Sequence, residues 1–352
     1  MENIFTQWFG DNLLTYVLIT IPVVIYVSVF ALYAVLAERK ISAWISNRIG
    51  PNRTDKYGLI QTILDAIKLV QKEIINPSKV DKGLYTMAPF IVFTAAFMGY
   101  AVLPFSSVFI GADLNIGLFY FFSISSLSVI GVLMAGWASN NKYSLFGGMR
   151  TVAQIVSYEI PTALSAVVIV MLTGTLSMQK YAEIQSGGLF NWYIFGGPGD
   201  LWKLLLIPIM VISFIILFAS TLAETNRTPF DLTEADSELV AGVHIEYSGM
   251  MFAMFFFAEY AQMFAVSAVI STLFLGGWQS PFGDLIPFLN TPVFQVFWFL
   301  AKGLMLVGVQ IWVRWTVPRV RIDQLMTICW KYFIPITLVN LFLVALYMVL
   351  FQ

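Results

Sequence analysis

The sequence predicts an all-α integral membrane protein with about eight transmembrane helices. Hydrophobic residues make up 59% of its 352 residues and charged residues only 11%, whereas a soluble domain has about 45–50% apolar and about 25% charged residues. Apolar stretches of about 20 residues, long enough to cross the hydrocarbon core, recur along the chain. None alternates polar and apolar positions as a membrane β-barrel strand does, so the spans are expected to be helices.

Charged or Gly/Pro-rich breaks separate the eight expected spans. They lie near residues 13–37, 86–105, 117–138, 153–175, 201–222, 248–275, 294–314 and 332–351. The first span follows no basic segment and runs directly into Glu38, so we expect a retained helix and not a cleaved signal peptide. Because no internal repeat interrupts this pattern, residues 1–352 are expected to form a single polytopic domain.

Lysine and arginine indicate which ends of the spans face the cytoplasm. Sixteen of the 19 follow the first, third, fifth and seventh spans, and nine of these lie within residues 38–82. We therefore expect these loops in the cytoplasm and both termini on the periplasmic side. Lys302 falls inside the seventh span, where its side chain either snorkels outward or pairs with an acid.

Composition also limits the cofactors and partners. Cys329 and His244 are the single cysteine and the single histidine, so this chain alone builds no iron–sulfur cluster on cysteines and no multi-histidine metal or haem site. The net charge of −1 gives no basic surface for nucleic acid. We expect no cofactor bound by this chain alone, and membrane lipid as a principal contact.

The first cytoplasmic loop, residues 38–82, contains an expected amphipathic helix over residues 58–75. Apolar residues recur there at steps of three and four, opposite Asp65 and two lysines. A basic amphipathic helix commonly lies on anionic headgroups. The alternative uses Asp65, an acid that headgroup binding does not require, in a polar pocket shared with Glu38 and Arg39 at the end of the first span.

The loop over residues 223–247 is strongly acidic, with one base, Arg227. Its acids are Glu224, Asp231, Glu234, Asp236, Glu238 and Glu246. Interleaved apolar residues such as Phe230 and Leu239 indicate a folded, partly buried segment, and the alternative is a solvated acidic loop. Asp231 or Thr233 is suited to cap a short helix there. Crowded carboxylates repel one another, so some are expected to hold protons near neutral pH.

Two further acids, Glu159 and Glu259, lie inside expected spans. A charge at mid-span costs about 2.5–3.5 kcal/mol even on lenient scales, so such residues usually face a protein interior and serve a function. Glu259 lies about 16 Å into its span at the helical rise, and Gln262 shares its face. Glu159 lies nearer a span edge, where snorkelling is the alternative.

The acids form a series from the loop into the bilayer. The loop acids come first, then Glu224 and Glu246 at span ends, then Glu159 and Glu259. Carboxyls joined by ordered water pass protons, and burial moves their pKa values toward the working range. The series predicts a proton path. His244 lies beside it, as a relay or as an ordinary hydrogen-bonded histidine.

Five segments give the sequence a specific resemblance. They are AERKISAWISNRIGPNR (37–53), YGLIQTILDAIKLVQKE (57–73), GWASNNKYSLFGGMRTVAQIVSYEIP (136–161), ETNRTPFDLTEADSELVAGVHIEYSGM (224–250) and VPRVRIDQLM (317–326). In this order they resemble the H subunit of the proton-translocating NADH-quinone oxidoreductases, respiratory complex I. The resemblance extends from the first span to the start of the eighth. Asp236, Ile322 and Gln262 depart from the residues usual in that family.

The resemblance implies a membrane subunit that forms much of the quinone chamber and couples quinone reduction to proton translocation. Quinone is then a substrate, and FMN and the iron–sulfur clusters belong to partner subunits. The implied chamber residues are Glu38, Arg39, Asp65, Arg227, Phe230, Glu234, Asp236 and Glu238. The implied proton path is Glu159, Glu224, Glu246 and Glu259. The expected location is the bacterial inner membrane, with the mitochondrial inner membrane as the alternative.

Three other functions fit parts of the pattern. A related membrane anchor of an energy-converting hydrogenase or another donor-linked dehydrogenase shares the architecture, although the long GPNR and PFDLTEAD segments favour the quinone enzyme. A proton-coupled secondary transporter would usually show internal repeats and broken helices. A passive assembly scaffold does not require an acid at mid-span, such as Glu259.

Overall fold

The computed structural model describes residues 13–199, 201–232, 236–283 and 286–351. Its long helices are α2 (Leu13–Ile45), α4 (Lys82–Met98), α5 (Gly117–Ala138), α6 (Lys142–Thr173), α8 (Ile207–Glu224), α10 (Gly249–Phe274), α11 (Pro292–Thr316) and α13 (Ile334–Phe351). The shorter α-helices are α3 (Leu59–Gln71), α7 (Met178–Ile184), α9 (Asp236–Leu239) and α12 (Ile322–Thr327). Eight helical segments are long and apolar enough to cross a membrane. No strand occurs in the described ranges, so the predicted all-α membrane fold is confirmed.

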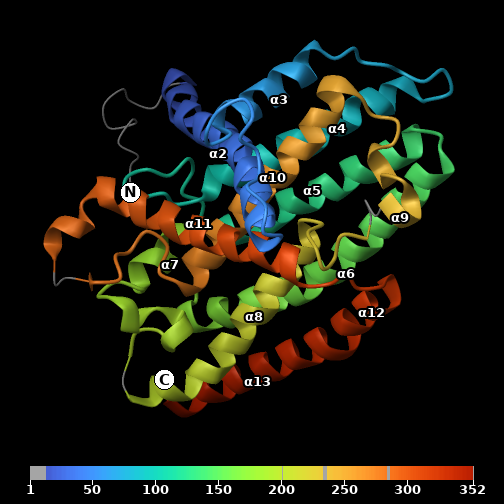
Figure 1. The fold of residues 1–352 in the computed structure, drawn as a ribbon. Helices are drawn as coiled ribbons and strands as arrows, with labels where there is room; N and C mark the ends of the chain where they lie inside the picture. Colours follow the sequence, from blue (N-terminus) through green and yellow to red (C-terminus); the bar gives the residue numbers. More distant parts are fainter. Residues whose placement is uncertain (1–12, 200, 233–235, 284–285, 352) are drawn as a thin grey trace.

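Helix α10 lies in the centre of the bundle, between α2, α4, α8 and α11 (Figure 1). Its sequence is apolar on every side and has almost no amphipathic stripe, which is the pattern of a helix surrounded by protein. Most of its residues are buried, including Phe264 and Phe274. An acid on such a helix, as Glu259 is, has protein around it, where a charged group can find polar partners.

Small residues bring α4, α5 and α6 into close contact on one side of α10. A Cβ on Gly131 of α5 would lie 2.5 Å from Val92 of α4, and a Cβ on Gly136 would lie 2.9 Å from the Ser144 carbonyl oxygen of α6. Such contacts leave no room for a larger side chain. Because lipid gives helices no hydrophobic reason to associate, close backbone packing of this kind is a main source of their affinity.

Three of the spans are longer than hydropathy predicts. Helix α2 continues to Ile45, α6 begins at Lys142 and the last span begins at Ile322, where α12 leads through a π-helical segment (Ile328–Phe333) into α13. The Asn141 side chain accepts a hydrogen bond from the Tyr143 backbone N–H and so caps α6. The added turns are polar, and therefore an apolar window does not detect them.

The loops predicted to share one side of the membrane do share one end of the bundle. In Figure 1, α9, α12 and the α5–α6 turn lie to the right, whereas α7, the start of α2 and the end of α13 lie to the left. Alternate loops share an end because each span crosses the bundle once, and an even number of spans also places both ends of the chain together. The basic residues therefore gather at one end of the molecule.

Both expectations for Lys302 are wrong. The side chain is 7% exposed, and its Nζ donates to the carbonyl oxygens of Leu275, Gly277 and Gln279 at 2.7, 2.9 and 2.7 Å. The Nζ also lies 4.0 Å from the centre of the Trp192 ring. A helix end leaves carbonyls without intrahelical donors, so the turn after α10 gives this buried cation backbone partners in place of an acid.

Candidate functional site

A buried ion cluster joins four segments near the end of the bundle that carries the acidic loop. We define the ion cluster as Glu38 of α2, Arg227 after α8, Tyr260 of α10 and Arg314 of α11. Glu38 Oε2 lies 3.4 Å from Arg227 Nη1 and accepts a hydrogen bond from the Tyr260 hydroxyl at 2.5 Å. Glu38 Oε1 lies 2.5 Å from Arg314 Nη1. Glu38 and Arg227 are 6% and 4% exposed, so these are charges held inside the protein.

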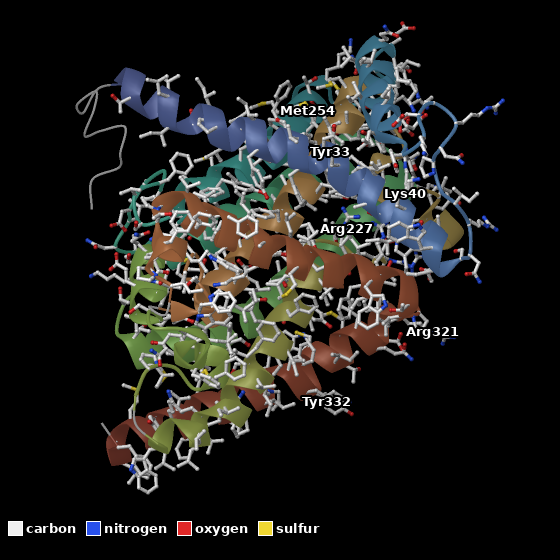
Figure 2. The ribbon with its side chains drawn as sticks, turned by 60° about the vertical axis from the view of Figure 1, so that its left-hand side comes forward. Tyr33, Lys40, Arg227, Met254, Arg321 and Tyr332 are labelled. Atoms are coloured by element: carbon white, nitrogen blue, oxygen red, sulfur yellow. The ribbon has the colours of Figure 1, made fainter. Side chains whose placement is uncertain are left out.

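The end of α8 directs Arg227 into this cluster, where Figure 2 shows it between α2 and α11. Asn226 adopts a left-handed conformation with φ 50°, and the Arg227 backbone N–H donates to the Leu222 carbonyl oxygen at 3.0 Å. This closes the helix and turns the chain back. The Arg227 guanidinium carbon lies 4.2 Å from the centre of the Tyr260 ring.

Arg227 stays charged in spite of its burial. Burial acts to lower the pKa of Arg227, but Tyr260, Glu38 and Glu259 outweigh this effect and raise its pKa above the ordinary value. Its Nε and Nη2 are buried and have no hydrogen-bond partner among the described residues. The ion cluster thus holds two guanidinium groups around one carboxylate, with N–H donors left over.

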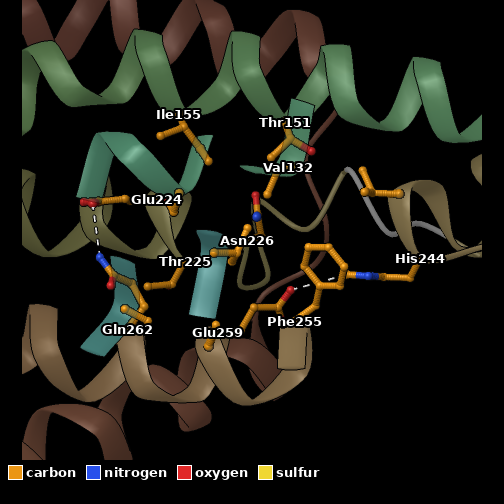
Figure 3. Close-up of a pocket in the computed structure, with 15 residues that line it drawn as sticks. Val132, Thr151, Ile155, Glu224, Thr225, Asn226, His244, Phe255, Glu259 and Gln262 are labelled. Carbon is orange, nitrogen blue, oxygen red and sulfur yellow. Dashed lines mark hydrogen bonds and ion pairs between the residues drawn. The ribbon is translucent and has the colours of Figure 1, made fainter. Parts of the chain in front are cut away.

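A small cavity lined by both apolar and polar side chains lies beside the ion cluster. Its volume is about 60 Å³, and its lining includes Glu224, Asn226, His244, Glu259 and Gln262 (Figure 3). A cavity needs about 10–15 Å³ to hold one water molecule, so this cavity has room for several water molecules. We call it the acid cavity. It lies between α6, the end of α8 and α10, with α4 and α5 completing the wall.

Two acids of the acid cavity have polar partners drawn in Figure 3. Glu259 has a carboxylate oxygen 3.6 Å from His244 Nε2. Gln262 was expected to share a face with Glu259, and its amide nitrogen donates to Glu224 at 3.5 Å. A Cβ on Gly147 of α6 would lie 2.8 Å from Gly242 Cα. This close approach seats the segment that carries His244 against α6.

Glu159 continues the series toward the far side of the bundle. Its carboxylate accepts a hydrogen bond from Ser126 of α5, and it interacts electrostatically with Glu224. Glu159 lies one turn along α6 from Ile155, which lines the acid cavity. The structure therefore brings Glu159, Glu224 and Glu259 together around one polar region.

Glu246 lies apart from this group, at the end of the bundle. Its Oε1 accepts a hydrogen bond from Asn141 Nδ2 at 2.7 Å. It lines a polar surface groove of about 400 Å³ with Lys79 and Lys142. Of the four predicted path acids, Glu246 alone lines the surface groove, where its carboxylate lies near cations and solvent.

The structure does not form the predicted shared pocket of Glu38, Arg39 and Asp65, because Arg39 and Asp65 pair at the surface while Glu38 is buried. Arg39 Nη1 lies 2.6 Å from Asp65 Oδ2 at the surface, and Gln61 donates to Asp65 Oδ1 at 3.1 Å. Partial burial acts to raise the pKa of Asp65, but the bonds from Arg39 and Gln61 outweigh it and its pKa lies below the ordinary value. Glu38 points the other way, into the ion cluster, because adjacent helical residues lie on different faces.

The acidic loop is folded, as its apolar residues predict. Phe230, Leu232 and Leu239 are buried, and the Phe230 ring lies 5.4 Å from that of Tyr158. Phe230 thus belongs to a hydrophobic core. The solvated-loop alternative does not hold for the described part of this segment.

The loop acids differ in their surroundings. Glu238 is paired with Arg150 at 2.6 Å at the surface, and Asp231 with Arg319 at 3.2 Å. Glu234 and the expected Thr233 cap lie outside the described residues. Asp236 begins α9, and its side chain also lies outside them.

Sequence reasoning missed three residues of this region. Tyr260 and Arg314 complete the ion cluster, and Ser126 binds Glu159. Tyr260 directly follows Glu259, but one more aromatic residue in an aromatic-rich span gives no distinguishing signal. The sequence signal for Arg314 is stronger, because Arg314 is a cation in the last turn of a span.

An eight-span bundle with buried, paired ionisable groups defines an integral membrane protein with a candidate functional site among its helices. Residues 17–345 of the sequence match the NADH dehydrogenase family. The chain therefore belongs to this family, among the membrane-embedded H subunits of NADH-quinone oxidoreductases.

Individual relatives share almost the whole length. The chain is 48% identical to the NADH-quinone oxidoreductase H subunit of Chlorobaculum tepidum over 350 residues, 97% of this chain and 94% of that protein. It is 45% identical to the protein of the same name from Brevibacillus brevis over 318 residues, 90% and 88% of the two chains. It is 42% identical to the protein of the same name from Bacteroides thetaiotaomicron over 364 residues, which cover 97% of this chain and 96% of that protein.

Proposed function

We propose that this chain forms part of the quinone chamber of an NADH-quinone oxidoreductase and starts the proton path that quinone reduction drives. The observation that carries this proposal is the adjacency of the ion cluster and the acid cavity. Residues 224–227 and 258–262 contribute to both. Fixed charges on one side of this junction therefore lie close to exchangeable carboxyls on the other.

The quinone tail lies between apolar helices, and the headgroup is held near the acidic loop and the ion cluster. A negative charge that arrives with reduction is attracted to Arg227 and Arg314 and repels Glu38. Because such a charge raises the proton affinity of nearby carboxylates, protons are drawn through the loop acids. Glu259, Glu224 and Glu159 respond next, through water in the acid cavity.

The electrons come from partner subunits, which carry the FMN and the iron–sulfur clusters. The described residues contain no group of three His, Cys, Asp or Glu side chains placed to hold a metal ion.

The basic end of the bundle faces the cytoplasm, and both termini face the periplasm of the bacterial inner membrane. The hydrophobic core is shared by most of the long helices, which supports one polytopic domain.

A photoreactive quinone with an intact tail tests the chamber directly. After illumination of the purified complex, we expect labelled peptides from this chain at the end of α2, at residues 225–232 and at the end of α11. Excess natural quinone should abolish that labelling. Labelling confined to partner subunits, or to residues 186–206 at the opposite end of the bundle, would contradict the chamber.

A further inference from the structure

Tyr260 contacts both charged partners that meet at the junction of the ion cluster and the acid cavity. Its hydroxyl donates to Glu38 at 2.5 Å, and its ring lies under the Arg227 guanidinium at 4.2 Å. Its side chain is 3% exposed. The hydroxyl therefore fixes the carboxylate, while the ring fixes the cation that faces it.

Its position on α10 connects this pair to the acid cavity. Glu259 precedes Tyr260 and turns about 100° away on the helix, into the acid cavity beside His244. Arg227 interacts electrostatically with Glu38 and also with Glu259. Two of its N–H groups have no acceptor among the residues described, so the guanidinium has donors to spare beyond its contact with Glu38.

From this arrangement we infer that Tyr260 is a positioning residue that couples the quinone side to the proton path. It holds Arg227 between Glu38 and Glu259, and a change of charge at Glu38 then alters the field at Glu259. This inference rests on the proposed function, and it assigns to Tyr260 a role in coupling, with no contact to quinone. Because Arg314 also binds Glu38, loss of the Tyr260 hydroxyl leaves that carboxylate with Arg314 and frees Arg227 from its set position.

The test compares Tyr260→Phe with Tyr100→Phe in the assembled complex. Tyr100 is a matched control, because it is also buried and its hydroxyl donates to the backbone carbonyl of Ala261 of α10 at 2.7 Å. In Tyr260→Phe the ring remains, and removal of one hydrogen bond to a charged group is expected to lower the kcat of quinone reduction about tenfold with little change in KM. The number of protons pumped per electron should also fall.

Tyr260→Leu removes the ring as well and should lower kcat and the proton ratio further, whereas Tyr100→Phe should keep both within about twofold of the unmodified complex. A Tyr260→Phe complex that behaves like Tyr100→Phe would overturn the inference. A rise in KM alone would also overturn it, since that result marks a quinone contact. Labelling by the photoreactive quinone decides the proposed function separately, because it does not depend on Tyr260.

Discussion

Individual charged residues in this protein differ mainly in how completely they are removed from water. Glu38 lies inside the bundle with three partners, whereas Glu238 is half exposed and has Arg150 as a surface partner. Exposed ion pairs contribute about 0–1 kcal/mol, but an uncompensated buried charge costs several times more. We therefore expect function to be more sensitive to changes in the ion cluster than to loss of the Arg150 pair at Glu238.

Lys302 gives a prediction about stability. Lys302→Met leaves three buried carbonyl oxygens without their donor, and each unpaired acceptor costs about 1–3 kcal/mol. The turn after α10 should loosen, and the thermal inactivation temperature of the purified complex should fall. Lys203→Met is the control, because Lys203 makes a single 3.3 Å bond to Phe190 at the surface. Equal inactivation temperatures for the two variants would show that the carbonyl cage is dispensable.

The loop acids give a prediction about activity. Glu234→Ala and Asp236→Ala each remove a carboxylate from the proposed proton entry, so quinone reduction and proton pumping should fall together. Reduction of ferricyanide by NADH, which takes electrons upstream of quinone, should continue at the unmodified rate. Glu183→Ala, on the opposite side of the bundle, is the control. If quinone turnover stays normal in both loop variants, these two acids have no part in the mechanism.

At the scale of elements, the amphipathic helix α3 is the clearest success of sequence reasoning. Its three- and four-residue spacing predicts a helix over 58–75, and α3 spans Leu59–Gln71. Several of its apolar residues are exposed, among them Ile63 at 44% and Val70 at 68%, which is the expected state of a helix that rests on lipid or a partner. The spacing of apolar residues predicts the helix itself. It does not predict which surface the helix covers, because that depends on residues elsewhere in the chain or in a partner.

Other features could not be predicted from local pattern. The early start of α6 depends on a cap at Asn141 and on glycines that fit α5 and the segment near Gly242. The acids could be found by their rarity in apolar spans. Their partners could not, because the ion cluster joins residues as far apart in sequence as Glu38 and Arg314.

The ion pair between Arg39 of α2 and Asp65 of α3 predicts how firmly α3 is held against α2. The low pKa of Asp65 means that the Arg39 pair is formed above the ordinary carboxyl pKa and is lost only as pH falls through the lowered value. The contact should therefore be constant near neutral pH. Asp65→Asn, which mimics the protonated acid, should speed amide hydrogen exchange across residues 59–71. Asp55→Asn, in the same loop, should not, and equal exchange in the two variants would count against the pair.

For the whole molecule, the uneven distribution of basic residues predicts its orientation. Phe190→Cys and Tyr57→Cys place exposed thiols at opposite ends of the bundle, in a Cys329→Ser background. A membrane-impermeant maleimide should label Phe190→Cys in intact cells. It should label Tyr57→Cys only in inverted vesicles stripped of peripheral subunits. The reverse pattern would place the acidic loop outside and remove the chamber from the cytoplasmic side.

In the proposed function, carboxyls around the acid cavity exchange protons in step with quinone reduction. The most direct measurement is the number of protons pumped per electron by the Glu259→Gln complex in proteoliposomes. Glutamine keeps the size and polarity of the side chain but does not ionise, so the ratio should fall well below that of the unmodified complex while Glu183→Gln leaves it unchanged. An unchanged ratio at full quinone turnover in Glu259→Gln would contradict the account and favour a passive scaffold.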